Sequence, residues 1–372
     1  MPKTCLAAVM PAPNAPVELR EFPEPELEPG AALLDTMYSE VCGTDVHLQH
    51  GKLSGVPYPI IPGHVSVGTV AKTRGPLRTV DGDSIKEGDV VTFLDVHETC
   101  NHCYHCLVAR QPNRCPSRRV YGITYSANDG LLGGWSQAIY MKPGVKMIHI
   151  PDGLAPETFI GGGCGIVTAL HAVDLAALRL GESVAVLGVG PVGQSAVALA
   201  ALSGAGEIVA VDSVADRLAY ARRMGATQTV SLDTPRKERL SLVHGMTRGR
   251  GVDVVIECSG HPDAVSEALD LVRDGGRVVV CGHYTDNGAV EIHPHYQINR
   301  KHVELRGCWG SRYEHFHRAV EIGTRFGGEK PWREMVGGKY RLEEAAVALG
   351  AVEERSVVKA LIAMGTFSGV SF

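Results

Sequence analysis

The segment SVAVLGVGPVG, residues 183–193, restricts the fold of this chain more than any other. An apolar β-type run leads directly into Gly188, Gly190 and Gly193, which have the spacing G-x-G-x-x-G. In a strand–turn–helix unit the first glycine permits the tight turn, the second lets the backbone approach a pyrophosphate, and the third lets the helix pack on the strand. The amino end of that helix faces the pyrophosphate. The spacing alone is a weak signal, because any glycine-rich turn between a strand and a helix can produce it.

The sequence around this segment favours a doubly wound sheet. Between residues 166 and 308, β-type runs alternate with helical candidates such as 214–225 and 261–275, whose apolar residues recur every three or four positions. Six strands joined by crossover helices predict a parallel sheet of the Rossmann type. The uncharged stretch 183–206 is long enough to cross a bilayer, but its glycines and proline predict a strand, a turn and a helix. The six runs are 182–189, 206–212, 227–232, 252–260, 276–282 and 302–310.

Asp212 ends the next predicted strand, 24 residues after Gly188. A carboxylate at this position accepts hydrogen bonds from an adenosine ribose and repels a 2′-phosphate. The alternative is a surface aspartate that caps the following helix. Arg217 complicates the choice of cofactor, because it could pair with a 2′-phosphate or lie along the adenine or in solvent. We predict NAD rather than NADP.

Residues 1–165 differ from the region that follows, because they are rich in proline, glycine and short β-type runs. These features predict an irregular, mostly antiparallel β domain. The segment 309–372 changes character again and is expected to return to this first domain. We therefore predict a discontinuous domain with the parallel-sheet domain inserted into it. The β-type runs of the first half are 31–41, 65–73, 89–96 and 135–143.

Four of the ten cysteines, Cys100, Cys103, Cys106 and Cys115, lie within sixteen residues in a lobe spanning about 97–116. Four thiolates with C-x-x-C spacings can close a tetrahedral zinc shell, which leaves no open position and holds a loop in place. A redox C-x-x-C pair is the alternative, but it leaves two cysteines unexplained. His102 and His105 could compete as ligands, although the cysteines suffice.

Three further residues are candidate ligands for a second metal. Cys42 lies in CGTDVH, His64 in PGHVSVG, and Cys164 in GGGCGIVTALHAV. Cys42 and His64 taken alone are better interpreted as buried side chains. A set of two cysteines and one histidine, however, leaves a fourth position for water or substrate.

With all of these motifs in order over essentially its whole length, the chain resembles the zinc-dependent medium-chain alcohol dehydrogenases. The resemblance implies a GroES-like catalytic domain, a Rossmann domain, and two zinc ions per chain, one catalytic and one structural. It implies hydride transfer between NAD and an alcohol and its ketone or aldehyde. The matching elements are CGTDVH, PGH…GTV, the four-cysteine lobe, GGWSQAIY, the segment 164–168, GVGPVG and Asp212.

The resemblance also implies roles for individual side chains. Zinc would act as a Lewis acid on the alcohol oxygen, and Thr44 would hydrogen-bond that oxygen and pass its proton by way of the nicotinamide ribose to His47. Asp45 would accept a hydrogen bond from the outer nitrogen of His64 and fix its tautomer. Thr168, one turn after Cys164, would contact the nicotinamide. The alternatives are local: turn formers, a solvated histidine and an ordinary helix residue.

The chain departs from the family pattern in ways that bear on its chemistry. The family usually has glutamate after the glycine–histidine pair, where this chain has Val65, which can neither coordinate nor carry charge. There is also one extra residue between Cys106 and Cys115. Polyol- and threonine-type relatives usually have an acidic residue in place of Cys164, so we predict an uncharged secondary or cyclic alcohol. The alternatives are a reductase of conjugated carbonyls and a non-catalytic binding protein.

Composition restricts the partners and the compartment. The formal net charge of −5 gives no support for a nucleic-acid or anionic-membrane partner, which leaves a small-molecule substrate. The start of the chain lacks the pattern of a signal peptide, so we predict a cytoplasmic protein with reduced cysteines. The family implies a homo-oligomer, a tetramer rather than a dimer, formed by edge pairing of the parallel sheets near 303–310.

Overall fold

The structure, a computed structural model, describes residues 3–364 and divides them into two units by their internal contacts. The first unit comprises residues 3–163, Arg312–Gly327 and 332–364, and the second comprises Cys164–Ser311 and Gly328–Pro331. The sequence places the boundaries after residues 165 and 308. The short return of Gly328–Pro331 to the second unit is not predicted from the sequence.

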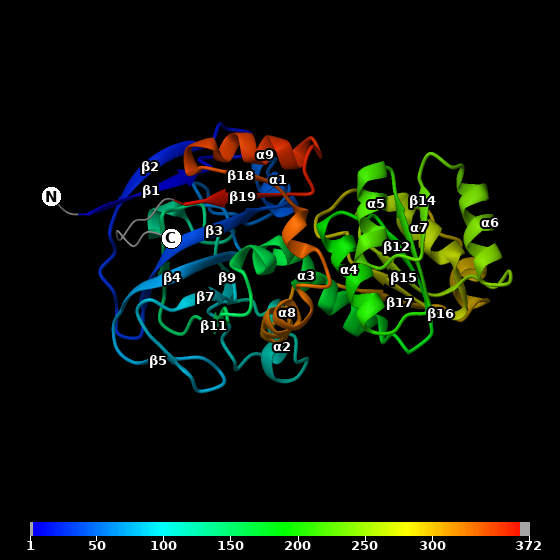
Figure 1. Cartoon of the computed structure of the whole chain (residues 1–372), viewed down its shortest axis with the longest axis horizontal. Coiled ribbons are helices and arrows are strands. Elements are labelled where there is room, and N and C mark those ends of the chain that lie inside the picture. The colour runs from blue at the N-terminus through cyan, green and yellow to red at the C-terminus, as the bar shows by residue number, and fades with distance from the viewer. Residues whose placement is uncertain (1–2, 365–372) are drawn as a thin grey trace. The chain divides into compact units, whose positions relative to one another are not determined.

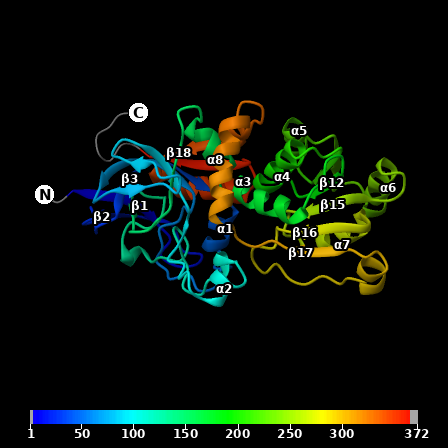
Figure 2. The same cartoon turned by 90° about the horizontal axis from the view of Figure 1, so that it is seen from below.

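The second unit is built on one six-stranded sheet with the strand order β14-β13-β12-β15-β16-β17. All of its strand pairs are parallel. This is the doubly wound order of a Rossmann sheet, so the predicted fold class is confirmed. Helices α4–α7 pack around the sheet (Figures 1 and 2). The elements are β12 (Ser183–Leu187), α4 (Pro191–Leu202), β13 (Glu207–Asp212), α5 (Ala215–Met224), β14 (Gln228–Ser231), α6 (Arg236–Met246), β15 (Val252–Glu257), α7 (Pro262–Leu271), β16 (Val272–Val280) and β17 (Glu304–Gly307).

The central strand β12 is apolar because the sheet is covered on both faces, and Val184, Ala185 and Val186 are fully buried. The uncharged stretch 183–206 forms β12, a turn and α4, as predicted. Helix α7 ends four residues before the end of the predicted helical segment. The reason is that β16 begins at once, with Val272 paired to Val252.

The first unit contains a seven-stranded sheet with the order β11-β7-β4-β3-β19-β18, and β10 also pairs with β3. Most of its pairs are antiparallel, as predicted, whereas β18 and β19 are parallel. Three two-stranded sheets, β1-β2, β5-β6 and β8-β9, surround it. The strands are β1 (Thr4–Val9), β2 (Glu18–Pro23), β3 (Ala32–Val41), β4 (Ser66–Thr73), β5 (Leu77–Arg78), β6 (Ser84–Ile85), β7 (Val90–Phe93), β8 (Val96–His97), β9 (Arg119–Val120), β10 (Ala138–Met141), β11 (Met147–His149), β18 (Val336–Tyr340) and β19 (Lys359–Ala363).

The C-terminal part of the chain completes the first unit. Strand β19 pairs antiparallel with β3, with Ala360 opposite Val41 and Leu361 opposite Glu40 (Figure 1). The last strand therefore lies beside the strand that leads into Cys42. The α-helices of this unit are α1 (Gly43–Gln49), α2 (Tyr104–Leu107), α8 (Tyr313–Phe326) and α9 (Ala345–Glu353), and the short helices are η1 (Pro112–Arg114), η2 (Ala127–Asp129), η4 (Trp332–Met335) and η5 (Leu342–Glu344).

Helix α3 (Pro156–Ala176) starts in the first unit and carries Cys164. Within the described residues it is the one helix long and apolar enough to cross a membrane, yet 78% of its most apolar window is buried inside the protein. The backbone at Gly163 is not helical (φ 45°, ψ −135°) and breaks the helix just before Cys164. A largely buried, interrupted helix is typical of a protein core.

Candidate zinc and dinucleotide sites

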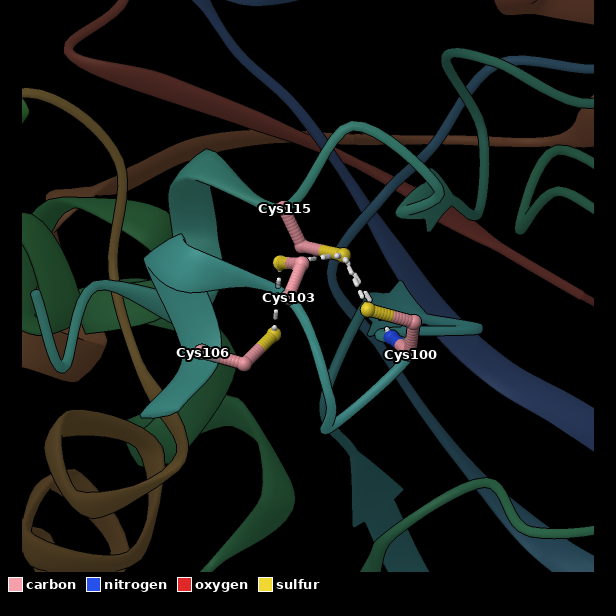
Figure 3. A group of neighbouring side chains, drawn as sticks. All are labelled: Cys100, Cys103, Cys106 and Cys115. Carbon is pink, nitrogen blue, oxygen red and sulfur yellow. Dashed lines mark hydrogen bonds between the residues drawn. The ribbon is translucent and has the colours of Figure 1, made fainter. Parts of the chain in front are cut away.

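The four-cysteine lobe brings its sulfurs together as the spacing predicts. The four Sγ atoms all lie within 4.8 Å of one another (Figure 3). Cys103 Sγ is 3.6 Å from Cys106 Sγ, and Cys115 Sγ is 3.6 Å from Cys100 Sγ and 4.0 Å from Cys103 Sγ. A Zn–S distance of about 2.3 Å places tetrahedral sulfurs about 3.8 Å apart, so the spacing fits a closed zinc shell. Pro112–Arg114 form the turn η1 that carries Cys115 into this group despite the extra residue in the loop.

Two thiols of the lobe, those of Cys103 and Cys115, have lowered pKa values, which favours thiolates at these positions. Burial raises the pKa of Cys115, but hydrogen bonds from the backbone amides of Cys100 and Ser117 outweigh it and lower this pKa to about 6. Burial and the Cys103 side chain raise the pKa of Cys106 to about 12. His102 lies outside the metal group, and its Nδ1 is 2.7 Å from the carbonyl oxygen of Cys100. A bound cation would favour deprotonation of the remaining thiols.

A second group of ligand atoms contains all three residues predicted for the catalytic metal. Sγ of Cys42, a ring nitrogen of His64 and Sγ of Cys164 lie within 4.8 Å of one another and of a carboxylate oxygen of Glu40. Cys42 and His64 are buried, and Cys164 is half-buried. Two thiolates, an imidazole and a carboxylate are a donor set suited to zinc.

Local backbone geometry positions Cys42 and His64. Strand β3 ends at Val41, so Cys42 caps the amino end of α1 with an extended backbone. The buried carboxylate of Asp45 accepts hydrogen bonds from the amides of Cys42 (2.8 Å) and Gly63 (3.4 Å). Asp45 therefore ties together the two segments that carry these ligands. Burial raises its pKa, and the nearby charge of His64 opposes that rise. The hydrogen bond expected between Asp45 and the outer nitrogen of His64 stays a prediction.

Two charged residues next to this group were not expected from the sequence. Glu40 Oε1 lies 3.5 Å from His64 Nε2, and Glu40 Oε2 lies 2.6 Å from Lys359 Nζ. Both charged side chains are completely buried. Their signal in the sequence is a charge within a mostly apolar strand, since charged residues are almost never fully buried unless paired. Glu40 stands in such a run in β3, and Lys359 in another, 319 residues away.

Asp95 is a third carboxyl group that the sequence did not point out. It is buried, and burial raises its pKa to about 6, while the charge of His64 opposes the rise and that of Glu40 adds to it. Asp95 is therefore part of the electrostatic environment of His64. It lies between β7 and β8, where it resembles an ordinary residue of a strand connection, so the sequence gives little reason to select it.

The side chains predicted to handle the proton lie on α1. Thr44 and His47 are half-buried and three residues apart, so they share one face of the helix. Burial, followed by the charges of Lys52 and His50, lowers the pKa of His47, which favours the neutral imidazole. Among the described residues, none hydrogen-bonds its buried Nδ1. Thr168 is half-buried on α3, one turn after Cys164.

The glycine motif has the geometry that its spacing predicts. Gly188 follows β12 with φ +83°, which an L side chain rarely adopts. A Cβ at Gly193 would lie 2.0 Å from the carbonyl oxygen of Gly188, so only glycine lets α4 pack this closely. Gly190 caps the amino end of α4, and a Cβ there would meet only Arg217 Nη1, at 3.9 Å. The loop is therefore open at Gly190, where the backbone can approach a ligand.

Asp212 is buried at the end of β13 and is bonded to the glycine loop. Its Oδ2 accepts a hydrogen bond from the amide of Val189 (2.7 Å), and its Oδ1 accepts one from the amide of Val214 (2.9 Å). Gln194 donates to the carbonyl oxygens of Val189 and Arg217. The first turn of α5 and the glycine loop are thus one hydrogen-bonded unit, with the Arg217 guanidinium beside Gly190.

Comparison with known proteins establishes the family. Residues 28–152 match the model of the alcohol dehydrogenase GroES-like domain, and residues 191–325 match that of the zinc-binding dehydrogenases. A 5-exo-hydroxycamphor dehydrogenase of Pseudomonas putida is 31% identical over 359 residues, which are 96% of this chain and 98% of that protein. The chain belongs to the zinc-dependent medium-chain alcohol dehydrogenases.

Other members of this alcohol dehydrogenase family show the same likeness. An L-threonine 3-dehydrogenase of Bacillus licheniformis is 34% identical over 272 residues, 72% of each chain. The crystal structure of an alcohol dehydrogenase from Thermotoga maritima superposes with a TM-score of 0.93 at 29% identity, covering 97% of this chain and 100% of that one. The predicted family, its GroES-like and Rossmann domains and its alcohol oxidoreductase class are therefore confirmed. Membership of this family supports zinc and a nicotinamide cofactor.

Proposed function

We propose that this alcohol dehydrogenase uses NAD to oxidise an uncharged secondary or cyclic alcohol to its ketone, and catalyses the reverse reaction. The observation that carries the proposal is the group formed by Cys42, His64 and Cys164. Two thiolates and one imidazole are a ligand set found at catalytic zinc sites, where substrate takes a further position. When bound there, zinc supplies a Lewis acid that makes the alcohol proton easier to remove.

Two side chains of α1 would bind the alcohol and accept its proton. Thr44 would hydrogen-bond the alcohol oxygen, and His47 would take the proton that leaves it. A neutral imidazole is the form that can accept a proton, and the lowered pKa of His47 favours that form. Asp45 would keep Cys42 and His64 in place, because its carboxylate accepts hydrogen bonds from the backbone amides of Cys42 and Gly63. Thr168 would contact the nicotinamide.

The choice of NAD rests on Asp212. Its carboxylate, held by the amides of Val189 and Val214, places a negative charge where a 2′-phosphate would have to lie. Arg217 favours the opposite choice, since its guanidinium lies beside the glycine loop. Titration with NADH and NADPH tests the proposal. We expect NADH to bind more tightly than NADPH. Asp212→Asn should reduce the difference between the two affinities. Tighter binding of NADPH by the wild type would contradict it.

The substrate class rests on three arguments. The 31% identical relative is named for a hydroxycamphor, which is a cyclic secondary alcohol. Cys164 stands where polyol- and threonine-type relatives usually have an acidic residue, and the sequence offers no basic clamp for a phosphate. The test is a panel of cyclic and linear secondary alcohols, polyols, threonine, ketones and conjugated enones. Turnover of cyclic or secondary alcohols is the expected result. Reduction of enones alone would instead identify a reductase of conjugated carbonyls.

Two further proposals concern the oligomeric state of the enzyme and its compartment. Strand β17 is an edge of the six-stranded sheet, and we propose that it pairs with a second copy on the way to a homotetramer. Light scattering after size-exclusion chromatography measures the mass directly, and a monomer would contradict this proposal. None of the ten cysteines, all within residues 3–364, is joined in a disulfide, and we propose a reducing compartment such as the cytoplasm.

A further inference from the structure

A carboxylate, that of Glu40, lies on the strand next to Val65. Val65 is buried, and its carbonyl oxygen accepts a hydrogen bond from the amide of Glu40 at 3.1 Å. The two residues are thus neighbours across β3 and the segment that enters β4. The side chain of Glu40 places Oε1 3.5 Å from His64 Nε2 and a carboxylate oxygen within 4.8 Å of the ligand atoms of Cys42 and Cys164.

Lys359 fixes the direction of this carboxylate. Its Nζ lies 2.6 Å from Glu40 Oε2 and also donates to the carbonyl oxygens of Gly162 (3.2 Å) and Ile160 (3.4 Å). Because Oε2 is held by the ammonium group, Oε1 is the oxygen that faces His64. A lysine that binds two carbonyls and one carboxylate has a defined position, and so has the carboxylate that it holds.

Gly163 links the same ion pair to the third ligand. A Cβ at Gly163 would lie 2.1 Å from Glu40 Oε2 and 2.5 Å from Lys359 Nζ, and its φ of +45° also favours glycine. The ion pair is therefore packed against the residue that directly precedes Cys164. A buried ion pair contributes little net stability, since apolar replacements are often neutral or stabilising. Its location next to the ligands of a metal suggests a role other than stability.

We propose that Glu40 is the fourth, exchangeable ligand of the metal held by Cys42, His64 and Cys164, with Lys359 as the residue that positions it. In the absence of substrate, Oε1 would close the tetrahedral shell; when substrate binds, the carboxylate would withdraw and remain neutralised by Lys359. The formal charges of two thiolates, one carboxylate, one zinc ion and one ammonium group sum to zero, which suits a buried site. This inference rests on the proposed function, because it needs a metal at this group.

The test is the rate at which zinc leaves the native protein for a chromogenic chelator. The double variant Glu40→Gln/Lys359→Met removes both charges and so avoids a buried, unpaired lysine. Its fold is checked by circular dichroism. We expect one of the two zinc ions to leave about tenfold faster or more, while the zinc of the four-cysteine lobe leaves at the wild-type rate. Release of both ions at wild-type rates would overturn the proposal.

A control variant and a variant that restores a carboxylate test whether the change in zinc release is specific to Glu40 and Lys359. The matched control Glu267→Gln/Arg239→Met removes another buried ion pair, whose Nε–Oε1 distance is 2.8 Å, in the second unit, and should leave both release rates unchanged. Adding Val65→Glu to the Glu40→Gln/Lys359→Met variant returns a carboxylate to the neighbouring strand and should slow release again. The ligand-field spectrum of cobalt in the same site should also change with Glu40→Gln/Lys359→Met. A wild-type protein that binds no zinc at Cys42, His64 and Cys164 would refute the proposed function itself, whereas zinc bound there with unchanged release in the variant would refute only the role of Glu40.

Discussion

Replacing Gly190 by alanine should weaken cofactor binding while leaving the fold nearly intact. The backbone of Gly190 (φ −69°, ψ −167°) is open to any residue, and an added Cβ would meet only Arg217 Nη1, at 3.9 Å. The cost to stability is then limited to the poorer helix cap, at most about 1 kcal/mol. Gly193→Ala differs, since its Cβ would lie 2.0 Å from the oxygen of Gly188, and should destabilise the second unit itself.

The effect of Gly190→Ala on binding follows from the space that the added methyl group takes. If a pyrophosphate lies against the backbone here, the methyl group overpacks the contact, which costs roughly 1–3 kcal/mol. The Kd for NADH should therefore rise by about 5- to 150-fold. Isothermal titration calorimetry measures this change, and urea unfolding measures stability in the same preparation.

Gly245→Ala is a suitable control for this prediction. Gly245 lies in helix α6 with nothing within 4 Å of an added Cβ, so its replacement should leave the Kd unchanged and stabilise the helix slightly. Unchanged affinity for NADH in Gly190→Ala, at unchanged stability, would refute the view that the cofactor approaches the backbone at this glycine.

Three further predictions concern the metal sites. Zinc should stay in the four-cysteine lobe at a pH of about 6 and be lost only at lower pH, because a bound cation keeps the Cys115 thiol deprotonated below the pKa of about 6 that it has without metal; metal analysis after dialysis at stepped pH checks this. Asp45→Asn should lower the free energy of unfolding by about 1–3 kcal/mol, since an amide offers one oxygen to the amides of Cys42 and Gly63; equal urea midpoints would contradict this. Burial raises the pKa of Asp95 from 3.8 to about 6, so its ionisation costs the metal-free protein roughly 3 kcal/mol at neutral pH. This cost disappears as the pH falls from about 6 to about 4, and the difference in stability between wild type and Asp95→Asn should shrink over that range.

The elements that could be predicted from the sequence are those whose signals are local. The glycine spacing, the alternation of strands and helices, and the C-x-x-C pairs each lie within a few dozen residues. The structure matches them because backbone sterics and metal geometry leave few alternatives. The boundary between α7 and β16 was predicted less well, because pairing with β15 determines where the helix ends. Sheet pairing depends on residues that are distant in sequence, so periodicity alone does not reveal it.

Glu40 illustrates what a single sequence leaves hidden. The motif around His64 directs attention to the residue that follows it, which is Val65. The carboxylate instead comes from the paired strand, and its partner Lys359 lies in the last strand of the chain. Recognising this requires the register that places Leu361 opposite Glu40, which no local pattern contains. The useful signal was charge in mostly apolar strands: Glu40 in β3, which also contains Asp35, and Lys359 at the start of β19.

Counting zinc in the wild type and in Cys42→Ala, together with alcohol-dependent formation of NADH, tests most directly whether Cys42, His64 and Cys164 hold a catalytic metal. We expect two zinc ions per chain in the wild type. Cys42→Ala should retain one zinc ion, in the four-cysteine lobe, and lose alcohol oxidation while it still binds NADH. A Cys42→Ala protein that keeps both zinc ions, or that oxidises alcohols at the wild-type rate, would contradict this assignment.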